Sequence, residues 1–502
     1  MPDQAPEAEA RAFAASFRSF LDWIHAAGDD GQRNEVAVLV SGFLGADGAA
    51  HSVVSRDLPV FEHVNLQTAI NAWSARPGRS VEVRGVLLPP HYSLLLQQLV
   101  SAESVPGQLR LIAPALADLP NGPDSTLGCL RLALLLVSDA RGRYILMIQA
   151  PGEHHPGLEV EVAGLPVAEA QAVLAELDQL RAELNVYRGH LLDVALHPMS
   201  GAVILAFAVP PGLRRDDVVL PDAVLRRVER HALGVAAHRD ALLGAGQHLK
   251  RGLLLYGPPG TGKTHTTRYL LGQMTGYTRL VLTGRALIGV GSVTELARDL
   301  QPSVVVLEDV DLVAEDRSMG PASSPVLFDL LDAMDGAAPD ADLLFLLTTN
   351  RADLLEPALA ARPGRVDVAV EIELPDAAAR ERLLALYGQG VPLALTPEDI
   401  AVAVERAEGA TASFLKELIR RSVLEALYDS QGQAGGPVVP PVTGVHLARA
   451  LDDLLDSAQG VTRTLLGVGV DPATLPAGGA LAMSPARMMA PRRGMVTRFY
   501  RG

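Results

Sequence analysis

The spacing of apolar and polar residues predicts helices over the first part of the chain. Apolar side chains recur at helical spacing at Phe13, Phe17, Phe20 and Ile24, and a Gly-Asp-Asp run follows them. Residues 36–43 and 64–73 show the same periodicity, so that the chain up to about residue 78 is expected to be helical.

The pattern then changes to one that mixes strands and helices. Residues 80–88 and 130–137 predict strands, and residues 91–100 predict a helix. A turn over residues 139–142 leads into a further apolar run over residues 144–149, which predicts a hairpin. Residues 167–193 predict one long amphipathic helix; it is expected to be a packed helix, because no apolar heptad is sustained. We expect a mixed α+β domain here.

A glycine-rich loop carries the first recognisable chemistry. The segment LLLYGPPGTGKT over residues 253–264 joins an apolar strand to a helix-like stretch over residues 266–274. Glycines let consecutive backbone N–H groups face an anion, and the start of a helix adds positive potential. Lys263 is placed to reach the β- and γ-phosphates, and the Thr264 hydroxyl to ligate magnesium.

Two further apolar strands end in polar residues. Residues 304–307 lead into Glu308 and Asp309, and residues 343–347 lead through two threonines into Asn350. Ligands bind at the carboxyl edge of open α/β sheets, where such side chains meet. The carboxylates are expected to hold magnesium through water and to polarise an attacking water, which the amide of Asn350 would orient.

Two arginines, Arg362 and Arg365, follow in the segment RPGR. They fit a solvated surface. In an oligomer they also fit arginine fingers that reach the γ-phosphate of the neighbouring subunit.

Together these segments resemble the AAA ATPases of the AAA+ superfamily, over about residues 215–459. Residues 257–264 resemble Walker A, residues 304–309 resemble Walker B, Asn350 resembles sensor 1, and residues 327–336 resemble the helix after Walker B. Residues 408–427 and 442–455 resemble parts of the helical lid. The resemblance implies an α/β P-loop core with a parallel sheet plus a helical lid, preceded by the α+β domain.

The resemblance also implies a division of the chain and a set of site residues. The divisions are an N-terminal domain with connector helix over 1–195, a nucleotide-binding domain over 196–375, a lid over 376–460 and a flexible tail over 461–502. The implied catalytic residues are Glu308, Asp309, Asn350, Arg362 and Arg365, with Thr264 and Glu308 as magnesium ligands. The implied ATP-binding residues are Gly257, Pro258, Pro259, Gly260, Thr261, Gly262, Lys263, Thr264 and the adjacent His265, together with Asp217 and Val218.

Several positions depart from the family pattern. Walker B reads Glu308–Asp309 where most members have Asp-Glu, an order that, with the segments DVVLP and KRG upstream, most resembles the mitochondrial Rieske-protein translocase branch. That branch has a membrane helix, which is not found in this sequence, so its substrate cannot be carried over. Ser413 stands where classical members have alanine, and no sensor 2 arginine is expected. At the central-pore position, Leu287 replaces an aromatic residue, which lowers the expectation of vigorous polypeptide threading.

The composition of the chain limits the classes of partner that it is expected to bind. The net charge of −15 argues against general binding to nucleic acid or an anionic membrane. A single cysteine, the lack of a secretory signal and apolar runs too short for a bilayer fit a cytoplasmic protein. No His-Glu-x-x-His occurs, which removes the simplest zinc-protease hypothesis. Of the 43 basic residues only Lys250, Lys263 and Lys416 are lysines, and one of them lies in the phosphate loop.

Two functions remain open from the sequence. The first is a ring-forming ATPase, typically a hexamer in this family, that remodels a protein partner. The second is a nucleotide-switched scaffold with slow hydrolysis, which the reversed carboxylates and the non-aromatic pore position favour.

Overall fold

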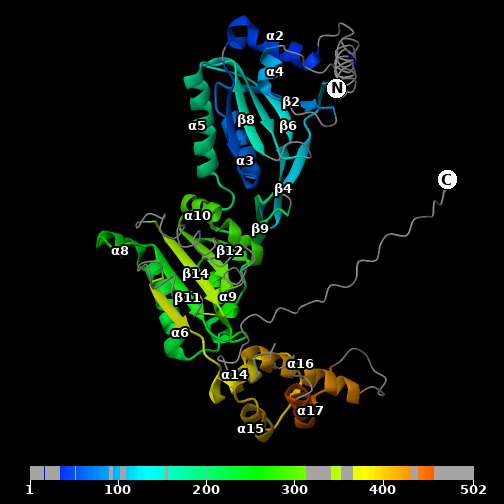
Figure 1. Ribbon diagram of the computed structural model, residues 1–502, viewed down its shortest axis with the longest axis vertical. Coiled ribbons are helices and arrows are strands. Elements are labelled where there is room, and N and C mark those ends of the chain that lie inside the picture. Colours follow the sequence, from blue (N-terminus) through cyan, green and yellow to red (C-terminus); the bar gives the residue numbers. More distant parts are fainter. Residues whose placement is uncertain are drawn as a thin grey trace, which may run out of the picture.

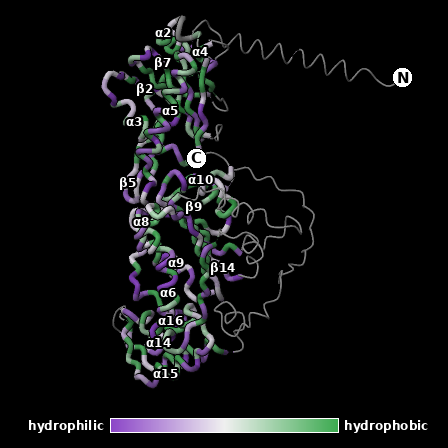
Figure 2. The backbone as a smooth tube through the Cα atoms, turned by 90° about the vertical axis from the view of Figure 1, so that its left-hand side faces the viewer, coloured by the Kyte–Doolittle hydropathy of each residue, from purple (hydrophilic) through white to green (hydrophobic). Residues whose placement is uncertain are grey.

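The computed structural model describes residues 34–50, 52–89, 94–101, 109–152, 157–198, 200–311, 341–351, 366–430 and 439–456, together with residue 16. An α+β domain, an α/β domain and a small helical domain follow one another along the long axis of the molecule (Figures 1 and 2). No helix within these ranges is both long enough and apolar enough to span a membrane.

The N-terminal domain is built on an antiparallel six-stranded sheet with the order β1-β8-β7-β6-β2-β3. Its strands are β1 (Val54–Leu58), β2 (Ser80–Leu87), β3 (Arg110–Ile112), β6 (Leu132–Asp139), β7 (Gly142–Gln149) and β8 (Leu158–Ala163). A separate hairpin pairs β4 (Leu116–Gly122) with β5 (Ser125–Leu130). The helices are α2 (Glu35–Ala49), α3 (His63–Ser74), α4 (Leu96–Ser101) and α5 (Val167–Glu183), with a short 3-10 turn, η1 (Val60–Glu62).

Helices cover both faces of this sheet. Leu135 and Val137 share one core with α3 and α5, whereas Leu134 and Leu136 share another with α2 and α4. Because successive side chains of a strand point to opposite faces, a strand buried on both sides reads as an unbroken apolar run. At the α3 side, the Arg79 guanidinium lies 3.7 Å from the centroid of the Trp73 ring and 3.0 Å from the Asp139 carboxylate.

The hairpin over β6 and β7 is confirmed, with Asp139 opposite Gly142, as are helices over the segments expected near residues 36–43 and 64–73. The expectation of an all-helical start is wrong, because β1 lies within it and pairs with β8. The run 130–137 is also divided, since Leu130 ends β5 and β6 begins at Leu132. The early helix near Phe13–Ile24 and the tail after residue 456 lie outside the described residues, except for residue 16.

The α/β domain contains a seven-stranded sheet with the order β10-β9-β12-β13-β14-β11-β15. Neighbouring strands are parallel, except that β10 runs antiparallel to β9. The strands are β9 (Leu191–Leu196), β10 (Val203–Ala208), β11 (Arg251–Tyr256), β12 (Thr278–Thr283), β13 (Ser303–Glu308), β14 (Leu343–Thr349) and β15 (Val368–Glu371). This mixed sheet confirms the predicted fold class.

Strand β9 corrects the long helix expected over residues 167–193. The helix α5 ends at Glu183, and the chain re-enters a sheet at Leu191, where β9 pairs with β12. A short apolar run does not reveal by periodicity alone whether it is helix or strand, and this one directly follows a helical pattern. The sequence pattern therefore does not predict β9, which is the first strand of this sheet along the chain.

Helices pack on both faces of this sheet as well. On one face α10 (Val290–Asp299) and the 3-10 segment η4 (Gly284–Gly289) cover Val305, Leu307 and Phe345. On the other face α6 (Asp222–Glu229) and α9 (Lys263–Gln273) cover Val304, Val306 and Leu344. The remaining elements are η2 (Arg215–Asp217), the π-helical turn η3 (Arg230–Gly234), α7 (Val235–Ala237) and α8 (Arg239–Gly244).

The helical domain contains α14 (Ala377–Tyr387), α15 (Pro397–Arg406), α16 (Ala412–Asp429) and α17 (Gly444–Leu455), with a two-stranded parallel ladder of β16 (Leu393–Ala394) and β17 (Val442–Thr443). Side-chain caps begin three of the helices, at Asp376, Thr396 and Thr411. The four helices enclose a core of their own.

The N-terminal and α/β domains share buried residues. Val64, Cys129 and Tyr187 belong to the same core as the sheet residues covered by α10. The Tyr187 hydroxyl donates to the carbonyl of Phe61 at 2.7 Å, and Arg188 donates to the carbonyl of Gln301 at 3.0 Å. The two domains are thus packed together at the end of the sheet that carries β9.

Candidate functional site at the carboxyl edge of the sheet

The phosphate loop joins β11 to α9 and depends on three glycines with positive φ. Gly257, Gly260 and Gly262 have φ values of 142°, 78° and 110°. A Cβ atom on Gly257 would lie 2.3 Å from the carbonyl oxygen of Ile372, so no other residue fits there without a shift of backbone. The loop has the shape that turns its backbone toward an anion at the start of α9.

Lys263 is held inside this loop. Its side chain is buried, and Nζ donates to the carbonyls of Gly257 at 2.9 Å and Pro258 at 2.8 Å. The Thr261 hydroxyl also donates to the carbonyl of Pro258, at 2.9 Å. Burial lowers the pKa of Lys263 to about 8, against the opposing effect of Asp309 and Asp311. A cation is therefore held where phosphoryl oxygens would bind.

Asp217 and Val218, two of the implied ATP-binding residues, belong to segment 215–219, which lies beside the first turn of α9. His265 Nε2 lies 3.0 Å from the carbonyl oxygen of Asp217, so this hydrogen bond joins the segment to the first turn of α9. The carboxylate of Asp217 accepts the backbone N–H of Arg214 at 2.8 Å, and Val218 is buried in the core. Val219 packs against the core of the helical domain.

Glu308 and Asp309 lie at the carboxyl end of β13, on the same edge as the loop. Burial raises the pKa of Glu308, Arg268 opposes this shift, and Asp309 and Asp193 add to it. Asp193 comes from β9, the strand that the sequence did not predict. Burial also raises the pKa of Asp309, Asp311 adds to the shift, and Lys263 and Asn350 oppose it.

The backbone at Asp309 is left-handed. Its φ is 50°, the one positive value among the described residues other than glycine. The Asp309 N–H donates to the Thr348 hydroxyl at 3.0 Å, and the N–H of Val310 donates to the Thr348 carbonyl at 3.0 Å. Aspartate tolerates this conformation better than most residues, and Thr348 fixes it.

Asn350 follows β14 and faces these carboxylates. Its side-chain nitrogen lies 3.4 Å from an oxygen of Asp309 and 3.4 Å from an oxygen of Asp311. Asp311 and Thr348 were not among the predicted site residues. The sequence does contain a signal for Asp311, because it is a further acidic residue only two positions after Asp309.

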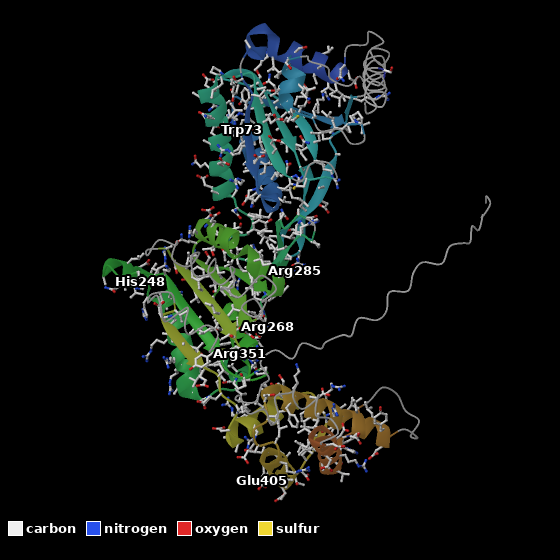
Figure 3. The ribbon with its side chains drawn as sticks, in the orientation of Figure 1. Trp73, His248, Arg268, Arg285, Arg351 and Glu405 are labelled. Carbon is white, nitrogen blue, oxygen red and sulfur yellow. The ribbon has the colours of Figure 1, made fainter. Side chains whose placement is uncertain are left out.

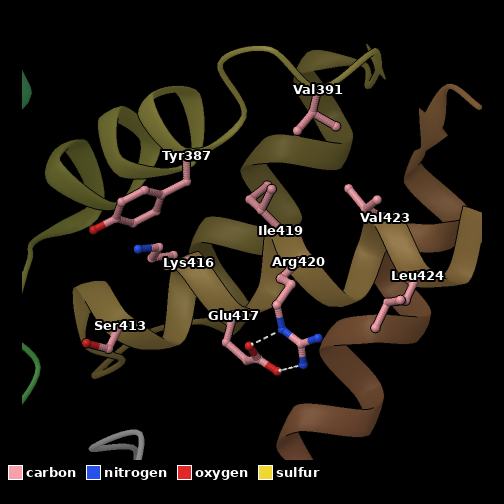
Figure 4. A pocket seen from close by; sticks show the side chains of 9 residues that line it. All are labelled: Tyr387, Val391, Ser413, Lys416, Glu417, Ile419, Arg420, Val423 and Leu424. Atoms are coloured by element: carbon pink, nitrogen blue, oxygen red, sulfur yellow. Dashed lines mark hydrogen bonds and ion pairs between the residues drawn. The ribbon is translucent and has the colours of Figure 1, made fainter. Parts of the chain in front are cut away.

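The helical domain closes one side of the loop. The Ser413 N–H donates to the carbonyl of Gly260 at 3.2 Å, and a Cβ on Gly260 would lie 3.0 Å from Ser413 Oγ and 3.1 Å from Thr411 Oγ1. Ser413 also lines a cavity of about 510 Å³ between α14 and α16. Figure 4 shows Tyr387 and Lys416 among the side chains that line this cavity, together with Glu417 and Arg420, which are joined by two hydrogen bonds.

The segment predicted to line a central pore has an unexpected orientation. Leu287 of η4 is 3% exposed and belongs to the core, whereas Ile288 is 55% exposed. A Cβ on the next residue, Gly289, would lie 3.1 Å from Leu196 Cδ2, which places η4 against the β9–β10 hairpin. Arg285 of the same segment lies at the end of the α/β domain that faces the N-terminal domain (Figure 3).

The donor set suits a magnesium ion shared with phosphates. Within the described ranges, no group of three or more His, Cys, Asp or Glu side chains could hold a metal ion alone. Magnesium in nucleotide sites uses one or two protein ligands plus phosphate oxygens. Thr264 in the first turn of α9 and Glu308 at the end of β13 supply hydroxyl and carboxylate oxygens at this edge.

The two predicted arginine fingers, Arg362 and Arg365, lie outside the described residues, as does the segment 327–336. The phosphate loop, Glu308, Asp309 and Asn350 are brought to one edge of the sheet by β11, β13 and β14.

This arrangement defines a P-loop nucleotide-binding domain. Residues 253–374 match the family model described as "ATPase family associated with various cellular activities (AAA)". This part of the chain is therefore an ATP-binding AAA ATPase domain.

Known proteins resemble part of the chain. It is 33% identical over 195 residues to the ATP-dependent zinc metalloprotease FtsH of Thermus thermophilus, covering 36% of this chain and 31% of the relative. It is 32% identical over 191 residues to Protein SAV of Sulfolobus acidocaldarius, covering 35% of this chain and 24% of the relative. The chain thus spans a third or less of the length of these curated relatives.

Among solved structures, the crystal structure of the FIGL-1 AAA domain is 22% identical, with a TM-score of 0.42, and covers 52% of this chain and 92% of that one.

Proposed function

We propose that this chain hydrolyses ATP with magnesium, assembles into a ring, typically a hexamer in this family, and uses the cycle to remodel a protein partner. The observation that carries the proposal is the meeting of the Lys263 loop with Glu308, Asp309 and Asn350 at one sheet edge. Residues 1–195 would select the partner, residues 196–375 and 376–460 would form the nucleotide domain and lid, and 461–502 would be a flexible tail.

Phosphate binding, metal binding and water activation fall to different residues of the site. Lys263 and the loop N–H groups hold the phosphates, and Thr264 and Glu308 hold the metal. Bound magnesium supplies charge neutralisation on the phosphate oxygens. Asp309 polarises the attacking water, and its raised pKa suits a group that accepts a proton. Asn350 orients the same water.

Partner contacts are proposed from the neighbouring segments. Arg362 and Arg365 would complete the site of the adjacent subunit. The exposed Ile288, and not the buried Leu287, would contact a polypeptide. Kinship with the Rieske-protein translocase branch rests on three short segments, and we propose it for the ATPase domain only, in a cytoplasmic protein.

Phosphate release by the purified protein, alone and with an added unfolded protein, tests the proposal. We expect turnover that rises with unfolded protein and is abolished in Lys263→Ala, together with ATP-dependent assembly in size-exclusion chromatography. Turnover that persists in Lys263→Ala would contradict the site, and a monomer with ATP would contradict the ring.

A nucleotide-switched scaffold is the second candidate. The shorter carboxylate at Asp309 and the burial of Leu287 favour it. It predicts tight ATP binding and assembly with slow hydrolysis that unfolded protein does not change, and the same assay separates the two functions.

A further inference from the structure

The cavity between α14 and α16 is apolar at the end that lies away from Ser413. This end, here called the α16 groove, is lined by Val391, Ile419, Val423 and Leu424 (Figure 4). Leu424 is 36% exposed, and Tyr428, one turn further along α16, is 62% exposed. Large apolar side chains that share one exposed surface mark a place where another apolar segment binds. The α16 groove is therefore a candidate docking surface.

The last turn of α17 lies beside the same cavity. Asp453 in that turn pairs with Arg421 of α16. Arg421 also donates to Glu417, at 3.0 Å, and Glu417 lines the cavity. Asp456, with which the described part of the chain ends, follows three positions after Asp453. Residues 457–502 therefore leave the helical domain next to the cavity.

The first apolar stretch after this exit is the segment VTRTLLGVGV over residues 461–470. It contains no acidic residue, and Arg463 is its one charged residue. Ten positions separate Asp456 from Leu466, and an extended chain spans about 3.3 Å per residue, so that Leu466 can reach about 33 Å from the exit. The 18 residues of α16 measure only about 27 Å. The segment is therefore long enough to reach any part of the groove.

The segment also has an apolar face that fits the spacing of side chains on α16. Side chains alternate along an extended chain, so Leu466, Val468 and Val470 would share one side, about 6.7 Å apart. Residues four apart in a helix, such as Ile419 and Val423, are about 6 Å apart along its axis. The two spacings match closely enough for this face to lie along α16.

We propose that residues 461–470 dock in the α16 groove of their own chain, with Leu466 and Val468 against α16. The covalent connection favours this occupant, because docking within one chain costs only the closure of a short loop. A separate molecule would also lose translational and rotational freedom. The inference concerns the helical domain alone and goes beyond the ATPase cycle proposed above. The flexible tail proposed above then begins after residue 470.

Disulfide formation between two introduced cysteines tests the docking in the full-length protein. Leu424→Cys places a thiol in the groove, and Leu466→Cys places one in the segment. Leu424 is partly exposed, so its replacement should leave the fold intact. The natural Cys129 is buried and does not compete. With oxidised glutathione as the oxidant, the two thiols should join within one chain at a rate at least about tenfold above that of a control pair.

The matched control pair combines Leu466→Cys with Val402→Cys. Val402 is 53% exposed on α15 and does not line the cavity. Arg406, one turn further along α15, pairs with Asp452 in the last turn of α17, at 2.7 Å. The chain that leaves α17 therefore reaches Val402 as readily as it reaches the groove, and the two pairs differ only in docking.

Non-reducing electrophoresis and peptide mass spectrometry distinguish a bond within one chain from a bond between two chains. Equal rates for the groove pair and the control pair would overturn the inference. A bond between chains would overturn it as well, because a second copy would then fill the groove.

Maleimide labelling of Leu424→Cys alone gives a second measurement, which needs no oxidant. Replacing Leu466 and Val468 with aspartate should release the segment and raise the labelling rate about fivefold. Labelling of Val402→Cys should stay constant under the same replacement. An unchanged rate at Leu424→Cys would show that the segment does not cover the groove.

Discussion

Asp311 and Asn350 are joined twice at the carboxyl edge of the sheet. One carboxylate oxygen of Asp311 accepts the backbone N–H of Asn350 at 3.1 Å, and the other lies 3.4 Å from its side-chain nitrogen. Asp311 is buried and also accepts the Thr349 hydroxyl at 2.9 Å. Asp311 therefore fixes the amide that faces Asp309.

Asp309→Asn is expected to bind ATP but to lose about 10²- to 10⁴-fold in kcat, because an amide cannot take a proton from the attacking water. Asparagine tolerates the left-handed backbone at this position, so the change tests the carboxylate alone. Single-turnover phosphate release and ATP binding would measure both effects. Unchanged turnover would refute the role of Asp309.

Asp311→Asn is expected to lower kcat about 10- to 100-fold with little change in ATP affinity, as residues that orient other site residues do. The reason is that one acceptor for the Asn350 amide becomes a donor. Asp299→Asn, at the exposed end of α10, is the control for a lost surface charge. A rise in KM with constant kcat would show that Asp311 acts on binding instead.

The parts of the site that could be predicted are contiguous in sequence. The loop over residues 257–264 and the pair Glu308–Asp309 carry their chemistry in neighbouring residues that follow apolar strands. Such strands are recognisable in the sequence, because burial on both faces produces unbroken apolar runs like those of β13 and β14.

The contacts that could not be predicted join distant segments. Ser413 reaches Gly260 across 153 residues, and Asp311 reaches Asn350 across 39. Strand β9 was missed because its six residues follow a helical pattern, so that Asp193 near Glu308 was missed with it. The burial of Leu287 depends on packing around η4, which no local pattern encodes.

Arg362→Ala is expected to abolish turnover through the adjacent subunit. In a mixed ring, an Arg362→Ala subunit still has Lys263, and an adjacent Lys263→Ala subunit can supply Arg362 to its site. Mixing the two inactive variants should therefore restore activity. Random mixing in equal amounts leaves about one quarter of the interfaces competent in a ring with head-to-tail contacts. Phosphate release from the mixture measures this, and no recovery would exclude action between subunits.

Ile288→Ala and Leu287→Ala are expected to separate partner contact from packing. Ile288 is exposed, so its truncation should leave stability within about 0.5 kcal/mol and reduce the stimulation of turnover by unfolded protein. Leu287 is buried, and its truncation should cost about 2–5 kcal/mol of unfolding free energy. If Leu287→Ala is stable and unstimulated, Leu287 is the contact residue, and the assignment to Ile288 is wrong.

Glu161 of β8 is a buried carboxylate in the N-terminal domain. It is 4% exposed and accepts the backbone N–H of Leu96, the first residue of α4, at 2.9 Å. Burial raises its pKa from 4.5 to about 7, with the Leu96 bond opposing the shift and Glu159 adding to it. The charged form is therefore disfavoured in the folded state.

A carboxyl group whose pKa is raised by folding stabilises the fold fully below its unfolded value, and this contribution is lost as pH rises through the folded value. For Glu161 the loss falls between about pH 4.5 and 7 and amounts to about 3 kcal/mol. Glu161→Gln stays neutral and keeps an oxygen for Leu96, so its stability relative to wild type should rise by about that amount between pH 4 and pH 8. Urea unfolding followed by tryptophan fluorescence, to which Trp73, buried in the same domain, contributes, measures the difference, with Glu82→Gln on β2 as the control for lost charge. A difference that does not change with pH would show that the Glu161 carboxyl titrates as it does in the unfolded chain.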